Sequence, residues 1–179
     1  MEPSPPILHR PRRLCYYKVD PRAIDSDLMM IESHLKRLGD LKLEAIKDIS
    51  SPEVLPCDLM VVGAQKVPEE AFLGWFSAFR SKMVTNASIW TPALVIADVS
   101  FEVLRSLLGQ AVQDNWYFDI VNPGQISSLP IRVANLLRIH DHLHELRRYA
   151  LALDEIQGQV RDLESQIVTL TQNQAQSRS

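Results

Sequence analysis

The chain has 179 residues, of which 46% are apolar, enough to bury a core and too many for an intrinsically disordered protein. A net charge of −3 gives no electrostatic case for binding nucleic acid or an acidic membrane surface. No window approaches the ~20 uninterrupted apolar residues that a membrane span needs, and the N-terminus lacks the apolar core of a signal peptide. We therefore expect a cytoplasmic protein without a membrane partner.

The N-terminal end and the two cysteines carry little information about function. Residues 1–12 contain four prolines and little to bury, so we expect a disordered leader. Cys15 and Cys57 each lie inside or beside an apolar run. This placement is typical of buried thiols in a reducing compartment rather than of a disulfide.

Short apolar runs then alternate with longer amphipathic ones. A strand is expected at 14–19, and apolar residues every three or four positions predict a helix over 24–38, which Gly39 is placed to end. A second strand is expected at 43–49. The stretch 50–56 holds two prolines and has room for a single helical turn at most.

The alternation continues through the middle of the chain. A third strand is expected at 59–62, and the helix after it opens at Pro68 with acids in its first turn. A fourth strand at 93–97 precedes a helix capped by Ser100, and a fifth strand falls at 117–121. The helix after Pro68 has four aromatic residues at helical spacing, which we expect in the core: Phe72, Trp75, Phe76 and Phe79.

From about Leu129 the pattern is helical nearly to the end of the chain. Strands that alternate with helices and are apolar on both faces indicate an α/β domain with a parallel sheet covered on both sides. We therefore predict a doubly wound, five-stranded parallel sheet over 13–140. Residues 141–179 are predicted to form a coiled coil with a frayed tail.

The coil prediction rests on a stripe of apolar residues spaced alternately by threes and fours. β-branched residues at the later a positions with leucine at d favour two parallel strands. At 1.5 Å per residue the stripe extends over about 37 Å, which one short chain cannot cover by folding back. The sequence therefore predicts a homodimer through a seam made of Leu146, Tyr149, Leu153, Ile156, Val160, Leu163, Ile167 and Leu170.

The strands carry a resemblance to a known family. Residues 58–62 (DLMVV), 92–96 (PALVI), and the step 122–123 (NP) followed by 132–138 (RVANLLR) resemble the receiver domain of bacterial response regulators. The resemblance covers roughly 14–140. It implies the flavodoxin-like receiver topology and a phosphorylation site at the carboxyl ends of the strands.

When the roles of the receiver residues are transferred to the matching positions of this chain, most of the residues that the phosphorylation site needs are missing. The phospho-acceptor position falls on Gly63, and of the two acids that would hold Mg²⁺ only Asp20 remains. The hydroxyl position falls on Ala97 and the lysine position on Asn122. Changes at these four positions imply a pseudo-receiver that cannot be phosphorylated. We therefore expect no cofactor and no enzyme activity.

The architecture also resembles the ANTAR-type antitermination regulators, in which a degenerate receiver with a clipped second helix is fused to a parallel coiled coil. The RNA-binding module of that family is absent from this sequence, so no nucleic-acid partner is expected of this chain alone. The resemblance implies a dimeric regulator in bacterial signal transduction or transcription control that acts through a protein partner.

Three alternatives stay open. One is a phosphorylation-competent regulator with displaced site residues, which would use Asp20, Asp58 or an acid near Asp25, with Ser100 as the hydroxyl. Another is the regulatory part of a longer output protein of the ANTAR or diguanylate cyclase type. The third is a metal site formed by the histidines of the segment 139–146 (IHDHLHEL). Two ligands four residues apart are only weak evidence for such a site. The preferred interpretation is a solvated, partly packed helix.

Overall fold

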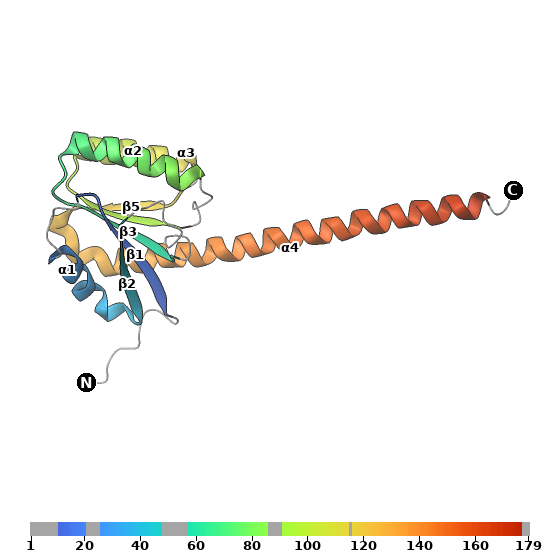
Figure 1. Ribbon diagram of the computed structural model, residues 1–179, viewed down its shortest axis with the longest axis horizontal. Coiled ribbons are helices and arrows are strands. Elements are labelled where there is room, and N and C mark those ends of the chain that lie inside the picture. Colours follow the sequence, from blue (N-terminus) through green and yellow to red (C-terminus); the bar gives the residue numbers. More distant parts are fainter. Residues whose placement is uncertain (1–10, 21–25, 48–56, 86–90, 115, 177–179) are drawn as a thin grey trace. The chain divides into compact units, whose positions relative to one another are not determined.

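The computed structural model describes most of the chain (Figure 1). The described ranges are 11–20, 26–47, 57–85, 91–114 and 116–176. The expected leader before residue 11, the proline turn at 50–56 and Asp25 lie outside these residues.

The core of the fold is a five-stranded sheet in which every neighbouring pair is parallel. The strand order β2-β1-β3-β4-β5 is that of the flavodoxin-like doubly wound folds, so the predicted fold class is confirmed. The strands are β1 (Arg12–Lys18), β2 (Leu41–Ile46), β3 (Leu59–Ala64), β4 (Ala93–Ala97) and β5 (Phe118–Val121).

Helices connect the strands and cover both faces of the sheet (Figure 1). The helical segments are α1 (Ser26–Leu35), η1 (Lys36–Leu38), α2 (Glu69–Thr85), α3 (Phe101–Asp114), η4 (Pro123–Ser128) and α4 (Leu129–Gln176). Their apolar residues form two cores. One lies between the sheet and α2 and α3, and the other between the sheet and α1 with the first turns of α4.

The α2–α3 core contains the predicted aromatic residues. Phe72, Phe76 and Phe79 are each 1% exposed, and Trp75 packs partly buried against them. The rings of Trp75 and Phe79 stack with centroids 4.9 Å apart, and Tyr17 of β1 also stacks with Trp75, at 6.0 Å. These contacts confirm that the aromatic stripe belongs to the core rather than to a binding face.

Several boundaries differ from the predicted ones by a few residues. β1 begins at Arg12, which the sequence pattern places in the leader, because the backbone N–H of Arg12 donates to the carbonyl of Asp40 at 3.0 Å. The helix predicted to Leu38 ends as α at Leu35 and continues as one tight 3₁₀ turn. Gly39 ends that turn with a φ of 126°, a conformation that glycine adopts at least cost.

The chain divides into two units at residues 141 and 142, and the described residues on each side form one compact unit. The first contains the sheet and all of its covering helices, and we call it the domain. The second is the remainder of α4, and we call it the coil segment.

Candidate functional site

The place to look for a site in this topology is the carboxyl edge of the sheet between β1 and β3. Chain order reverses there, since β1 has β2 on one side and β3 on the other. Ligands of open α/β sheets bind in the crevice outside the carboxyl ends of the strands at such a switch point. The edge is formed by the residues that follow Lys18 in β1 and Gly63 in β3.

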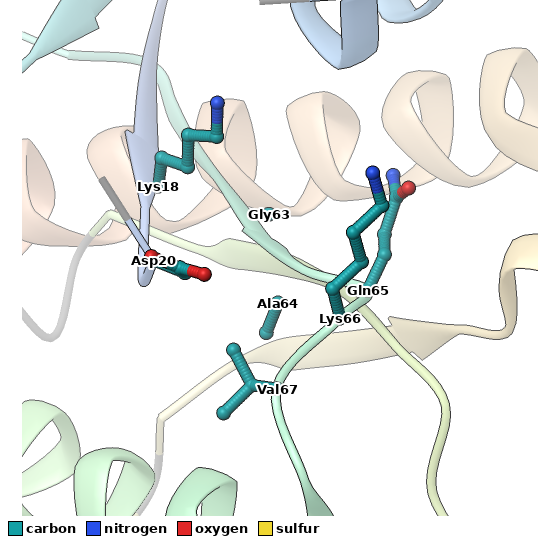
Figure 2. Close-up of a pocket in the computed structure, with 7 residues that line it drawn as sticks. All are labelled: Lys18, Asp20, Gly63, Ala64, Gln65, Lys66 and Val67. Atoms are coloured by element: carbon teal, nitrogen blue, oxygen red, sulfur yellow. The ribbon is translucent and has the colours of Figure 1, made fainter. Parts of the chain in front are cut away.

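A small cavity lies at this edge (Figure 2). Its volume of about 10 Å³ is at the lower limit for a single water molecule. Figure 2 shows the side chains of Lys18, Gln65 and Lys66 extending to the same side, while the Asp20 carboxylate points across the space below Gly63. The described residues that line it are Lys18, Asp20, Gly63, Ala64, Gln65, Lys66 and Val67.

Gly63 is required by a neighbouring side chain. A Cβ built on Gly63 would lie 2.3 Å from the hydroxyl oxygen of Tyr16 and 3.0 Å from its Cζ. Tyr16 is 4% exposed in the core under α1 and α4, so its ring has little freedom to withdraw. No aspartate fits at position 63 while Tyr16 keeps this place. The tyrosine therefore occupies the space into which an acceptor side chain would extend.

The other positions of the degenerate site are only partly brought together. Asp20 lies with Gly63 in the lining of the cavity, whereas Ala97 and Asn122 do not. Ala97 is 1% exposed and packs in the α2–α3 core, on the opposite face of the sheet from Tyr16. Its methyl side chain cannot donate a hydrogen bond to a phosphoryl oxygen.

The polar side chains that follow β4 and β5 form hydrogen bonds with neighbouring loops and helix starts. The Asn122 amide nitrogen donates to Asp98 at 2.9 Å, and its oxygen accepts from the backbone N–H of Gly124 at 2.9 Å. Ser100 caps α3 as predicted, accepting from the N–H of Val103 at 3.4 Å. Its own N–H donates to Glu69 at 2.7 Å, which joins the starts of α2 and α3.

Asp58 lies at the opposite, amino end of β3, in a buried polar cluster. Its carboxylate accepts from the N–H of Arg13 at 2.8 Å and lies 3.6 Å from both the Arg12 guanidinium and Nδ1 of His140. Arg12 in turn donates two hydrogen bonds to Asp141, at 2.8 and 2.5 Å. Asp58 is therefore committed to structural contacts remote from the carboxyl edge.

The cluster is unusual because it buries charge. Arg12 is 6% exposed and His140 4% exposed, and the hydrogen bond with Asp141 is the main cause that raises the pKa of Arg12. A bidentate arginine–carboxylate pair satisfies both groups, which offsets the cost of removing them from water. The sequence pattern did not single out this pair, because the two residues are 129 positions apart.

Neither cysteine forms a disulfide, and both are buried as predicted. A hydrogen bond with Cys15 and burial both raise the pKa of the Cys57 thiol. Cys57 also donates to the carbonyl of Leu59 at 3.0 Å. A buried thiol held in its protonated form is a poor nucleophile.

Within the described ranges, no three histidine, cysteine, aspartate or glutamate side chains gather closely enough to hold a metal ion. Of the three histidines that invited that idea, His140 is buried beside Asp58, while His142 and His144 are exposed. The structure therefore does not bring the three together.

The predicted dimer seam lies in one continuous helix. All eight seam residues belong to α4, and none is buried within the chain. Their exposed fractions run from 47% at Val160 to 67% at Tyr149.

The part of the chain that the structure describes has no helix both long enough and apolar enough to cross a membrane.

Comparisons with known proteins add only a distant likeness of fold. No family model matches the chain, and no curated protein matches it. A mutant flavo di-iron protein from Thermotoga maritima is similar in structure, with a TM-score of 0.44 and 14% sequence identity. The match covers 73% of this chain and 35% of that one, so this chain spans about a third of the structure it matches. The flavodoxin-like fold therefore rests on the strand order.

Proposed function

We propose that this protein is a non-phosphorylatable, receiver-like signalling module that works as a dimer and regulates a protein partner. The setting would be bacterial signal transduction or the control of transcription termination. The observation that carries the proposal is the contact between Gly63 and Tyr16. With a Cβ at position 63 only 2.3 Å from a tyrosine hydroxyl, the carboxylate on which receiver chemistry depends has no place.

The rest of the carboxyl edge supports the same function. Phosphoryl transfer to a receiver needs an acceptor, two acids for Mg²⁺ and groups that bind the phosphoryl oxygens. Among the described residues that line the cavity, Asp20 is the only acid, and Lys18 and Lys66 line the cavity with it.

The coil segment supports the dimer. Eight large apolar side chains that alternate at a and d positions over more than three heptads are each about half exposed or more. An exposed stripe of this length is typical of a helix that meets a second helix. A dimer would present two copies of the domain, and a partner that binds one arrangement better than another would shift its population.

The first experiment is treatment of the full chain with Mg²⁺ and acetyl phosphate, followed by intact-mass measurement. A phosphorylatable receiver treated in parallel shows that the reagent is active. We expect no mass increase on this chain, even at long incubation.

A stoichiometric, acid-labile adduct would overturn the proposal and favour a phosphorylation site with displaced residues. Asp20→Asn and Asp58→Asn would then locate it. Loss of the adduct in Asp20→Asn alone would place the chemistry at the carboxyl edge.

A further inference from the structure

The coil segment carries a second exposed feature, on the side of the helix away from the seam. Each residue turns an α-helix by about 100°, and on that basis five side chains lie within about 60° of their common mean direction around the helix axis. All five are exposed, and the leucine in the middle is 62% exposed. We call this set the charged face: Arg147, Arg148, Leu151, Asp154 and Glu155.

The order of charges on this face makes it complementary to itself. Two arginines precede Leu151 by four and three residues, and two acids follow it at the same spacings. If two such helices cross antiparallel with a two-fold axis at Leu151, Arg147 meets Glu155 of the second copy and Arg148 meets Asp154. A two-fold contact requires one patch to match itself, and this sequence does.

The residues at the two ends of the face fit the same arrangement. Gly158 lies seven positions after Leu151, and His144 lies seven before it, so the antiparallel contact places the two opposite each other. A Cβ on Gly158 would meet nothing within 4 Å, so no contact with the described part of the chain requires a glycine there. Glycine costs a helix about 1 kcal/mol relative to alanine, and it allows a second helix to come close.

We propose that dimers of this chain associate through the charged face, with helices antiparallel and centred on Leu151. This inference rests on the proposed dimer, because the seam on the far side of the helix must be covered by the first partner. Each dimer carries two charged faces, so association proceeds in steps of a whole dimer, to tetramers and larger even-numbered assemblies. The occupant of the face is a second copy of this chain.

The size of the contact sets its strength. The helix from His144 to Gly158 is about 21 Å long, and one helix face of that length buries less than a stable interface needs. Opposite charges at the surface also weaken with salt, since the screening length is about 10 Å at 0.1 M and about 3 Å at 1 M. We therefore expect an association that is weaker than the dimer and sensitive to ionic strength.

The test is sedimentation of the full chain over a wide range of concentrations at low and high salt. We expect a dimer at low concentration and, at low salt only, masses that rise by whole dimers. A monomer at every concentration would contradict the proposed function and, with it, this inference. A dimer that never grows would overturn this inference and leave the proposed function intact.

Charge variants make the test specific. Arg147→Glu with Arg148→Glu makes the face wholly acidic, and we expect it to abolish assembly beyond the dimer while the dimer persists. Adding Asp154→Arg and Glu155→Arg reverses every pair at once and should restore assembly. Arg161→Glu, one substitution of the same kind at a position beyond the contact, should leave assembly within about twofold of the original. Assembly that ignores the first variant, or that the reversal fails to restore, would overturn the antiparallel pairing.

Discussion

The domain and the coil segment differ in how much of their regularly spaced apolar side chains they bury. The domain buries its own large side chains, so that Phe76, Leu94 and Ile96 are at most 1% exposed. In the coil segment, Leu153 and Leu163 are 57% and 58% exposed although they repeat as regularly as any core residue. The domain covers its core by itself, whereas the apolar stripe of the coil segment stays exposed within the chain and would be covered in the proposed dimer. Stability of the domain should therefore be independent of protein concentration, whereas order in the coil segment should depend on it.

The largest expected effect that tests this comparison is in the domain core. Phe76 contacts Phe72, Phe79, Trp116 and Phe118, so Phe76→Ala leaves a cavity at the centre of the aromatic cluster. We expect a loss of about 3–5 kcal/mol in the free energy of unfolding. Urea titration followed by tryptophan fluorescence measures it. A midpoint that moves with protein concentration would show that the domain is not complete alone.

The seam variant Leu163→Ala should show the reverse behaviour. We expect the proposed dimer to weaken by about 2–3 kcal/mol, roughly 30- to 150-fold in Kd, because Leu→Ala removes contacts that the second helix of the dimer would supply. Sedimentation equilibrium measures the Kd. The matched control is Val168→Ala, at an equally exposed position off the seam, which should change the Kd less than about threefold. Equal effects of the two would contradict the seam.

The next largest effect on stability is expected at the contact between Gly63 and Tyr16, which excludes an acceptor side chain. Gly63→Ala brings a Cβ against the Tyr16 hydroxyl, and we expect a loss of about 1–3 kcal/mol from overpacking. Adding Tyr16→Phe removes the closest atom and should recover part of the loss, which a double-mutant cycle in urea would measure. Gly74→Ala on α2, where a Cβ meets nothing within 4 Å, should instead be neutral or stabilise by up to about 1 kcal/mol.

The smallest expected effect is on pH dependence. The raised pKa of the Cys57 thiol means that the folded domain keeps a proton that the unfolded chain loses above its ordinary thiol pKa of about 8.5. The contribution of this group is therefore fully present below that pH and is lost as the pH rises, by up to about 1.4 kcal/mol per unit. Urea midpoints from pH 7 to 10 measure the slope. In Cys57→Ala the slope should be smaller, and an unchanged slope would show that another group is responsible.

The parts that could be predicted from the sequence are those that repeat. Strands that are apolar on both faces, the aromatic stripe of α2 and the alternation of threes and fours in α4 all follow from burial along a periodic element. The parallel sheet covered on both sides was predicted from the alternation of strand and helix, whereas the order of its strands came from the resemblance to receivers. These features depend on neighbours in sequence, so one sequence is enough to find them.

What escaped prediction depends on residues that are distant in the chain. The resemblance to receivers identified Gly63 as unusual, but only the fold shows that Tyr16, from another strand, occupies the space beside it. Lys18 and Lys66 were overlooked at the same edge because each is an ordinary surface residue in its own segment. The register of β1 against β3 is what brings them together.

The pair formed by Arg12 and Asp141 has a practical consequence for anyone who expresses the domain by itself. A gene fragment cut where the apolar pattern begins and ends, at residues 13 and 140, deletes both halves of the pair and leaves Asp58 and His140 without the arginine beside them. A fragment that starts at 13 and keeps Asp141, or starts before 12 and stops at 140, removes only one half and leaves the other charge unmatched. A fragment that preserves every group of the cluster must therefore include both Arg12 and Asp141.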